Sequence, residues 1–106
     1  MDLETLLTGT KWEILEILAS RPSSPLELAE KLSTTIANIS QQLRLLQTAG
    51  LVQKQRTGSG QAGKPRVLFS LSDNYAFITI LSKGFAKKKL IKISSKQKEV
   101  LKQLIK

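Results

Sequence analysis

Two short amphipathic segments joined by a tight turn constrain the fold of this chain more than any other feature. The segments cover residues 25–32 and about 35–49, and only residues 33–34 separate them. Apolar residues recur at helical spacing in both, and Gly50 follows the second segment where a left-handed residue commonly ends a helix. Two helices this short cannot bury their own apolar faces, so a third helix has to close the core.

Capping residues mark where both helices begin. Ser24 precedes Pro25, which suits the first helical position, and Glu27 follows the cap by three residues, as a capping box requires. Thr35 is expected to cap the next helix. The inward rows are predicted to be Leu28, Ala29 and Leu32 on the first helix, and Ile39, Leu43 and Leu46 on the second.

The third helix of this core is predicted over residues 10–20. Thr10 is the expected N-cap and Glu13 completes a capping box, while the helix stops before Arg21 because Pro22 disfavours a helical residue ahead of it. The apolar stripe of this helix, expected in the core, comprises Trp12, Ile14, Leu15, Leu18 and Ala19.

Two β-type segments follow the helices. Residues 51–57 and 66–72 indicate strands, and the glycine-rich segment 58–65 between them predicts a hairpin with a polar tip. One face of the second strand is expected to be buried, because apolar residues alternate at Val67, Phe69 and Leu71.

The last third of the chain allows two interpretations. Residues 75–81 are β-branched and aromatic, and residues 87–93 follow a short polar turn, so a second hairpin is favoured over an amphipathic helix. Residues 94–106 predict an amphipathic terminal helix. Its apolar stripe comprises Val100, Leu101, Leu104 and Ile105.

The charge distribution indicates a polyanionic partner. The chain has 17 Lys and Arg against 8 Asp and Glu, a net charge of +9. Residues 1–52 hold four basic and six acidic residues, whereas residues 53–106 hold thirteen basic and two acidic ones. Such an excess most often meets nucleic acid, although a Lys-rich surface that only confers solubility is the alternative.

The absence of Cys and His excludes several functions. No disulfide framework, thiolate metal site, Ser/His/Asp triad or Cys/His pair can form. The acidic residues fall at expected surface positions of helices, which gives a two-carboxylate site no support. We therefore expect neither an enzyme nor a bound metal or cofactor.

The central motifs resemble the winged helix-turn-helix of ArsR-like transcriptional regulators, and the neighbouring MarR- and PadR-type regulators share the pattern. The resemblance covers roughly residues 10–73. Its matching stretches are residues 28–32 (LAEKL), 40–43 (SQQL), 49–52 (AGLV), 63–66 (GKPR) and 69–72 (FSLS). Residues 84–93 (GFAKKKLIKI) are similar to those of short archaeal members. Metal-sensing members of the family use Cys and His, so metal sensing is not carried over.

The resemblance implies an α+β fold, a three-helix bundle with a β-hairpin wing, extended at the C-terminus and ending in the amphipathic helix. Residues 1–73 would form the DNA-binding domain. Residues 74–106 would be a basic extension within the same compact domain and the expected dimerisation element. The helix from residue 35 to 49 would be the recognition helix, and residues 51–72 the wing.

Residues on the outer face of that helix suit the reading of base edges. Asn and Gln can bond adenine bidentately, and Arg can do so with guanine. The candidates on the helix are Thr35, Ile36, Ala37, Asn38, Ser40, Gln41, Gln42 and Arg44. On the wing, Arg56, Lys64 and Arg66 are expected to reach phosphates or the minor groove.

The glycines of residues 58–64 (GSGQAGK) match two nucleotide-binding patterns, G-x-G-x-x-G and G-x-x-x-x-G-K. A P-loop needs Ser or Thr after the lysine, and Pro65 stands there instead. Both patterns also need a helix to follow, whereas residues 66–72 predict a strand. We therefore expect no nucleotide binding.

Two further surface features have a structural and a functional interpretation. Lys87, Lys88 and Lys89 are candidates for phosphate contacts, although a run of three lysines is more often a solvated surface. The C-terminal apolar stripe is expected to form a dimer interface, because it has no aromatic residue of the kind that anchors a helix to a membrane.

These observations together predict a cytoplasmic regulator that binds double-stranded DNA as a homodimer and acts by occupying an operator. The N-terminus carries acidic residues where a secretory signal carries basic ones, and no apolar run approaches the roughly 20 residues that span a bilayer. The alternatives are a winged-helix adaptor for another protein and a sequence-indifferent nucleoid or RNA-binding protein.

Overall fold

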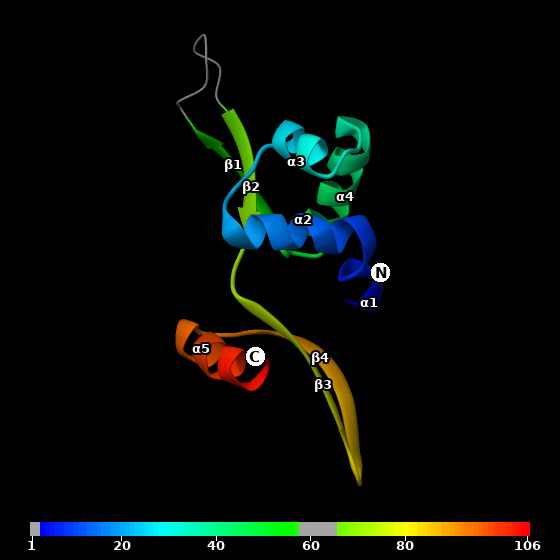
Figure 1. Cartoon of the computed structure of the whole chain (residues 1–106), viewed down its shortest axis with the longest axis vertical. Coiled ribbons are helices and arrows are strands. Elements are labelled where there is room, and N and C mark those ends of the chain that lie inside the picture. The colour runs from blue at the N-terminus through cyan, green and yellow to red at the C-terminus, as the bar shows by residue number, and fades with distance from the viewer. Residues whose placement is uncertain (1–2, 58–65) are drawn as a thin grey trace. The chain divides into compact units, whose positions relative to one another are not determined.

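The computed structural model describes residues 3–57 and 66–106, which fall into two units, Met1–Ser72 and Asp73–Lys106 (Figure 1). The first unit contains α1 (Leu3–Leu6), α2 (Gly9–Ser20), α3 (Pro25–Lys31), α4 (Ile36–Thr48), β1 (Val52–Thr57) and β2 (Arg66–Leu71). The second contains β3 (Tyr75–Ser82), β4 (Phe85–Lys92) and α5 (Ser95–Leu104). The described residues thus have the predicted α+β fold, a winged helix with a C-terminal extension that ends in a helix.

The core of the first unit lies between α2, α3 and α4 and continues onto the β1–β2 hairpin. Each fully buried aliphatic side chain contributes about 1.5–3 kcal/mol relative to exposure. The predicted inward rows are confirmed except at Leu32, which is half-buried. The buried apolar residues of this unit are Leu6, Ile14, Leu15, Leu18, Leu28, Ala29, Ile39, Leu43, Leu46, Leu51, Val52 and Phe69.

The N-terminus of α3 has the predicted capping box. The Ser24 hydroxyl accepts from the Glu27 backbone N–H at 3.2 Å, and the Glu27 carboxylate accepts from the Ser24 N–H at 3.1 Å. Arg21 donates to the other oxygen of the same carboxylate at 2.8 Å. Glu27 therefore fixes both the start of α3 and the end of the preceding loop.

The cap predicted for α2, with its Thr10–Glu13 capping box, and part of the predicted buried stripe are wrong. Its N-cap is Thr8 rather than Thr10, because the Thr8 carbonyl already accepts the first helical bond, from the N–H of Trp12, and Gly9 begins the helix at φ +61°. Thr8 makes no side-chain cap. Trp12 is also 44% exposed. The residues of α2 that face the core are Ile14, Leu15 and Leu18, and Trp12 lies outside the arc of the helix that they form. Ala19, predicted in the same stripe, is exposed as well.

Tight turns end α3 and α4 where they were predicted. Ser33 adopts φ +52° in the turn between the helices. Gly50 adopts φ +83° after α4, and the next N–H, of Leu51, donates back to the Leu46 carbonyl at 3.0 Å. This left-handed residue reverses the chain so that β1 can begin directly at Val52.

The β1–β2 hairpin is antiparallel, with Val52 opposite Leu71 and Thr57 opposite Arg66. Of the three residues predicted to alternate on the buried face, only Phe69 is buried, while Val67 and Leu71 are half-buried. Backbone bonds of 3.0 and 2.8 Å join Phe69 to Ser23 in the loop before α3. This bridge fastens the hairpin to the helices.

The second unit is a hairpin followed by a helix. β3 pairs antiparallel with β4 from Tyr75 opposite Lys92 to Ser82 opposite Phe85, so residues 75–93 form the predicted hairpin and not the alternative helix. Ser94 caps α5 in a second capping box, accepting from the Gln97 N–H at 3.1 Å while the Gln97 carboxamide oxygen accepts from the Ser94 N–H at 2.8 Å.

Candidate nucleic-acid interface

Helix α4 combines a buried row with an exposed polar face. Ile39 and Leu46 are completely buried and Leu43 is 1% exposed, so the helix cannot rotate about its axis without losing this packing. At its N-terminus the Thr35 hydroxyl accepts from the Asn38 N–H at 3.1 Å, which confirms the predicted cap. The direction of every outward side chain is therefore fixed by the core beneath it.

The exposed face of α4 carries most of the predicted base-reading residues. Gln41 and Arg44 lie three residues apart, so they are neighbours on one stripe of the helix. Both are exposed, and Gln41 makes no side-chain hydrogen bond to the described part of the chain. The other predicted residues exposed on α4 or its cap are Thr35, Ile36, Ala37 and Ser40.

Two of the predicted residues are partly engaged within the protein. Asn38 donates to the Thr34 hydroxyl at 3.0 Å, and its carboxamide oxygen accepts from Gln42 at 3.2 Å. Both amides are half-buried. This chain of bonds holds Gln42 in place and leaves its oxygen and one N–H for a partner. Thr34 is not among the residues predicted for this site, although its spacing of four residues from Asn38 is the signal for such a bond.

The wing offers two adjacent cationic side chains among its described residues. Lys54 and Arg56 are both exposed on β1, and as alternate residues of one strand they lie on the same face. Arg56 is one of the predicted wing residues, whereas Lys54 is not. The alternation of side chains along a strand identifies Lys54, because it lies two residues before Arg56. Arg66 begins β2. Lys64 and the glycine pattern of residues 58–64 lie outside the described residues.

The three consecutive lysines are placed on β4. Lys87, Lys88 and Lys89 are exposed, and their neighbours across the hairpin are Ile80, Thr79 and Ile78. Side chains of a strand alternate between its two faces, so Lys87 and Lys89 lie on one face of the hairpin and Lys88 lies on the other. The lysines are therefore not a single patch.

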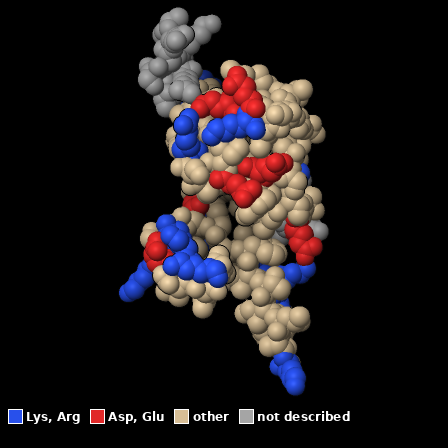
Figure 2. Space-filling model, in the orientation of Figure 1, with Lys and Arg blue, Asp and Glu red and all other residues tan. Residues whose placement is uncertain are grey.

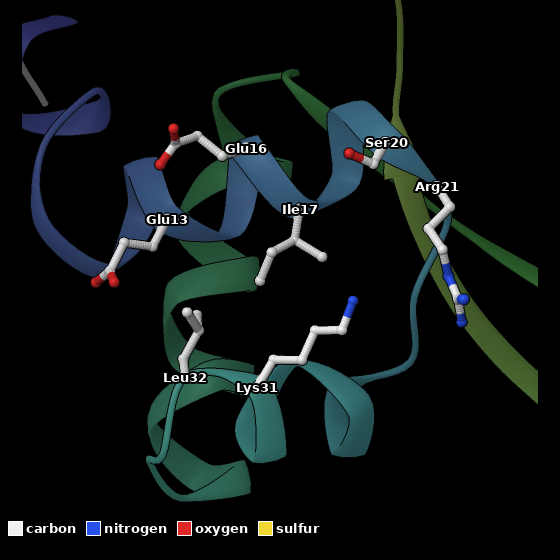
Figure 3. Close-up of a pocket in the computed structure, with 7 residues that line it drawn as sticks. All are labelled: Glu13, Glu16, Ile17, Ser20, Arg21, Lys31 and Leu32. Carbon is white, nitrogen blue, oxygen red and sulfur yellow. The ribbon is translucent and has the colours of Figure 1, made fainter.

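A shallow pocket of about 350 Å³ lies between α2 and α3 (Figure 3). In Figure 3, Ile17, Lys31 and Leu32 project into the gap between these helices, while the Arg21 side chain points away from it. Glu13, Glu16 and Ser20 complete the lining. The lining mixes both signs of charge around a small apolar floor and does not include the exposed face of α4.

The described residues contain neither a cluster of metal-binding side chains nor a membrane-spanning helix. Across residues 3–57 and 66–106, no three side chains of His, Cys, Asp or Glu gather where they could hold a metal ion. In the same ranges, no helix is long and apolar enough to cross a lipid bilayer.

Comparisons with known proteins place these features in a family. A family model described as HVO_A0114 matches residues 6–71, which include α2, α3, α4 and the wing strands. Two solved variants of ZitR from Lactococcus lactis are similar to the chain at 31% and 32% sequence identity, with TM-scores of 0.57 and 0.56. Each similarity covers 67% of this chain, but 47% and 45% of the ZitR chains, so this chain matches about half their length. A comparison with curated proteins finds no match.

Proposed function

This chain belongs to the HVO_A0114 family, and on that premise we propose that it is a sequence-specific DNA-binding transcriptional regulator of the ArsR-like type, acting in the cytoplasm. The observation that carries the proposal is the two-faced structure of α4. Its inner row is completely buried at Ile39 and Leu46, and its outer face presents Gln41 and Arg44 with no apolar cover. A helix held this rigidly with polar side chains outward suits the major groove of DNA.

The similarity to the ZitR structures, at 31% and 32% identity, supports the winged-helix fold on which the proposal rests. The charge supports the proposal as well, since residues 53–106 hold thirteen of the basic residues and two of the acidic ones. Phosphate neutralisation supplies most of the sequence-independent affinity for a duplex. In this arrangement α4 would read bases, while the wing residues Arg56, Lys64 and Arg66 and the lysines of β4 would contact phosphates.

A homodimer would place two copies of α4 in successive major grooves. Residues 1–73 would serve as the DNA-binding domain and residues 74–106 as the dimerisation element. Val100, Leu101, Leu104 and Ile105 would form the interface. A two-fold dimer predicts an operator with two half-sites about 10–10.5 base pairs apart, or a multiple of that spacing. Occupancy of such an operator would exclude the transcription machinery.

The experiment is selection of duplexes from a random pool, followed by affinity measurements for Gln41→Ala on the best sequence and on a scrambled one. Gln41→Ala is expected to lose about 1–3 kcal/mol on the selected site and little on the scrambled duplex. Gln47→Ala is the matched control, because Gln47 is exposed near the C-terminal end of the same helix.

Two results would contradict the proposal. An equal loss on both duplexes would remove Gln41 from base reading and leave it a positioning role. Failure of any preferred sequence to emerge from the pool would exclude sequence-specific regulation, and would favour the protein adaptor or the sequence-indifferent nucleic-acid binder.

A further inference from the structure

The end of the β3–β4 hairpin is a narrow arm whose side chains are exposed. Residues 79–89, which we call the hairpin arm, are all exposed, whereas Tyr75 to Ile78 in the first half of β3 are half-buried. Lys83 and Gly84 form the turn, in which Gly84 adopts φ +85° and the Ser82 hydroxyl donates to the Phe85 carbonyl at 3.1 Å. In Figure 1 the arm extends away from α5 within its own unit.

Basic and apolar side chains share one face of this arm. Directly opposed residues of an antiparallel pair project to the same side, so Lys87 lies with Ile80, and Phe85 lies two residues away from Lys87 on that same side. The apolar residues of this face are unusually exposed for their type, at 47% for Ile80 and 52% for Phe85. A solvated surface would not need two large apolar side chains at its end.

The sequence around the hairpin arm is rich in lysine and poor in acidic residues. Between Asp73 and Glu99 the sequence has seven lysines and no acidic residue. The Nζ atom of Lys92 lies 3.9 Å from the Oδ2 atom of Asp73 and forms an ion pair with it. Lys87 and Lys89 have no ion pair within the described part of the chain. In Figure 2 the far end of the hairpin carries a basic side chain, while Asp and Glu lie mainly over the helices of the first unit. The arm therefore fits an anionic partner.

We propose that the hairpin arm is a second DNA-binding element, with Lys87 and Lys89 on phosphates and Ile80 and Phe85 against base edges. A two-stranded ribbon has strands about 4.8 Å apart and fits a major groove about 12 Å wide. The lysines would then reach phosphates at the groove margin, and the apolar tip would meet surfaces such as thymine methyl groups. This inference rests on the proposed function, but it needs no contact from α4.

The test compares two charge-matched variants, Lys87→Ala/Lys89→Ala in the arm and Lys96→Ala/Lys98→Ala on α5. All four lysines are exposed. The arm variant should flatten the log–log dependence of DNA affinity on salt by about 0.9 for each lost phosphate contact, equally on selected and random duplexes. The α5 variant should leave the slope unchanged. Equal flattening by both variants, or by neither, would overturn the proposal.

Lysine acetylation read by mass spectrometry provides a second measurement on the unaltered protein. Duplex DNA should protect Lys87 and Lys89 several-fold more than Lys96, and equal protection would overturn the assignment. Ile80→Ser/Phe85→Ser should lower DNA affinity several-fold without changing the salt slope. Unchanged affinity would remove the apolar tip from the interface.

Two controls distinguish this proposal from membrane binding by the arm and from the sequence-specific regulation proposed above. Vesicles of phosphatidylserine and phosphatidylcholine serve as the anionic membrane, and an arm variant that loses vesicle binding while keeping its DNA salt slope would assign the arm to membranes instead. If random-pool selection yields no preferred sequence but the arm variant still flattens the slope on random duplexes, the arm stands and sequence-specific regulation fails. A normal Gln41 effect with an unchanged slope would mean that regulation stands and the arm does not bind DNA.

Discussion

At the scale of single residues, the loop before α3 depends on a few polar side chains. Ser24 and Glu27 bond to each other's backbone, and Glu27 also pairs with Arg21. One residue earlier, buried Ser23 makes the backbone bridge to Phe69. Two functions of the loop therefore fall on adjacent residues, starting the first helix of the motif and holding the wing.

Ser24→Ala should destabilise the protein by about 1 kcal/mol, because it leaves the Glu27 N–H without its capping acceptor. For a domain of this size, that change lowers the melting temperature by about 4–8 °C. Thermal denaturation followed by circular dichroism measures it. Ser20→Ala, at an exposed position in the last turn of α2, is the control and should change the melting temperature little. Equal shifts in the two variants would show that the capping box does not stabilise the fold.

At the scale of elements, sequence predicts local features well and long-range ones poorly. The capping residues of α3, α4 and α5 are separated from their partners by three residues, so sequence pattern suffices to place the first two caps. The exposure of Trp12 depends on which arc of α2 meets the core, and the Ser23–Phe69 bridge joins residues far apart in the chain. The bonds of Asn38 and Gln42 join residues four apart, a spacing that permits such bonds but does not select among the several polar side chains that share it.

The wing strand β1 should contribute phosphate contacts through Lys54 and Arg56. Lys54→Ala/Arg56→Ala should weaken binding to selected and random duplexes alike, and should flatten the salt dependence by about 0.9 per lost contact. Affinity measured across a salt series tests this. Gln53→Ala/Gln55→Ala, exposed on the other face of the same strand, is the control and should leave the slope unchanged. An unaltered slope in the basic pair would mean that this face of the wing stands off the DNA.

At the scale of the whole molecule, the C-terminal helix has an apolar stripe that is exposed in the described chain except at Leu101, which is half-buried. No residue of α5 is buried, and Leu104 and Ile105 are 75% and 82% exposed. Val100 and Leu104 are four residues apart and therefore adjacent on the helix surface. A contiguous apolar stripe on a small protein favours association with a second copy, which buries the same surface on both partners.

Leu104→Glu should shift the protein from dimer to monomer, because it would bury a carboxylate in the proposed interface. Leu104 is so exposed that the change should leave the fold intact, which circular dichroism can verify. Gln103→Glu is the matched control, since it adds the same charge one residue away at an exposed position and should leave the dimer intact. Analytical ultracentrifugation measures the dimerisation of both variants.

Because a dimer binds two half-sites at once, the monomeric variant should also lose affinity for an operator with both half-sites more than for a single half-site. A wild-type protein that sediments as a monomer at tens of micromolar, roughly the range for a weak homodimer, would contradict the proposed dimer.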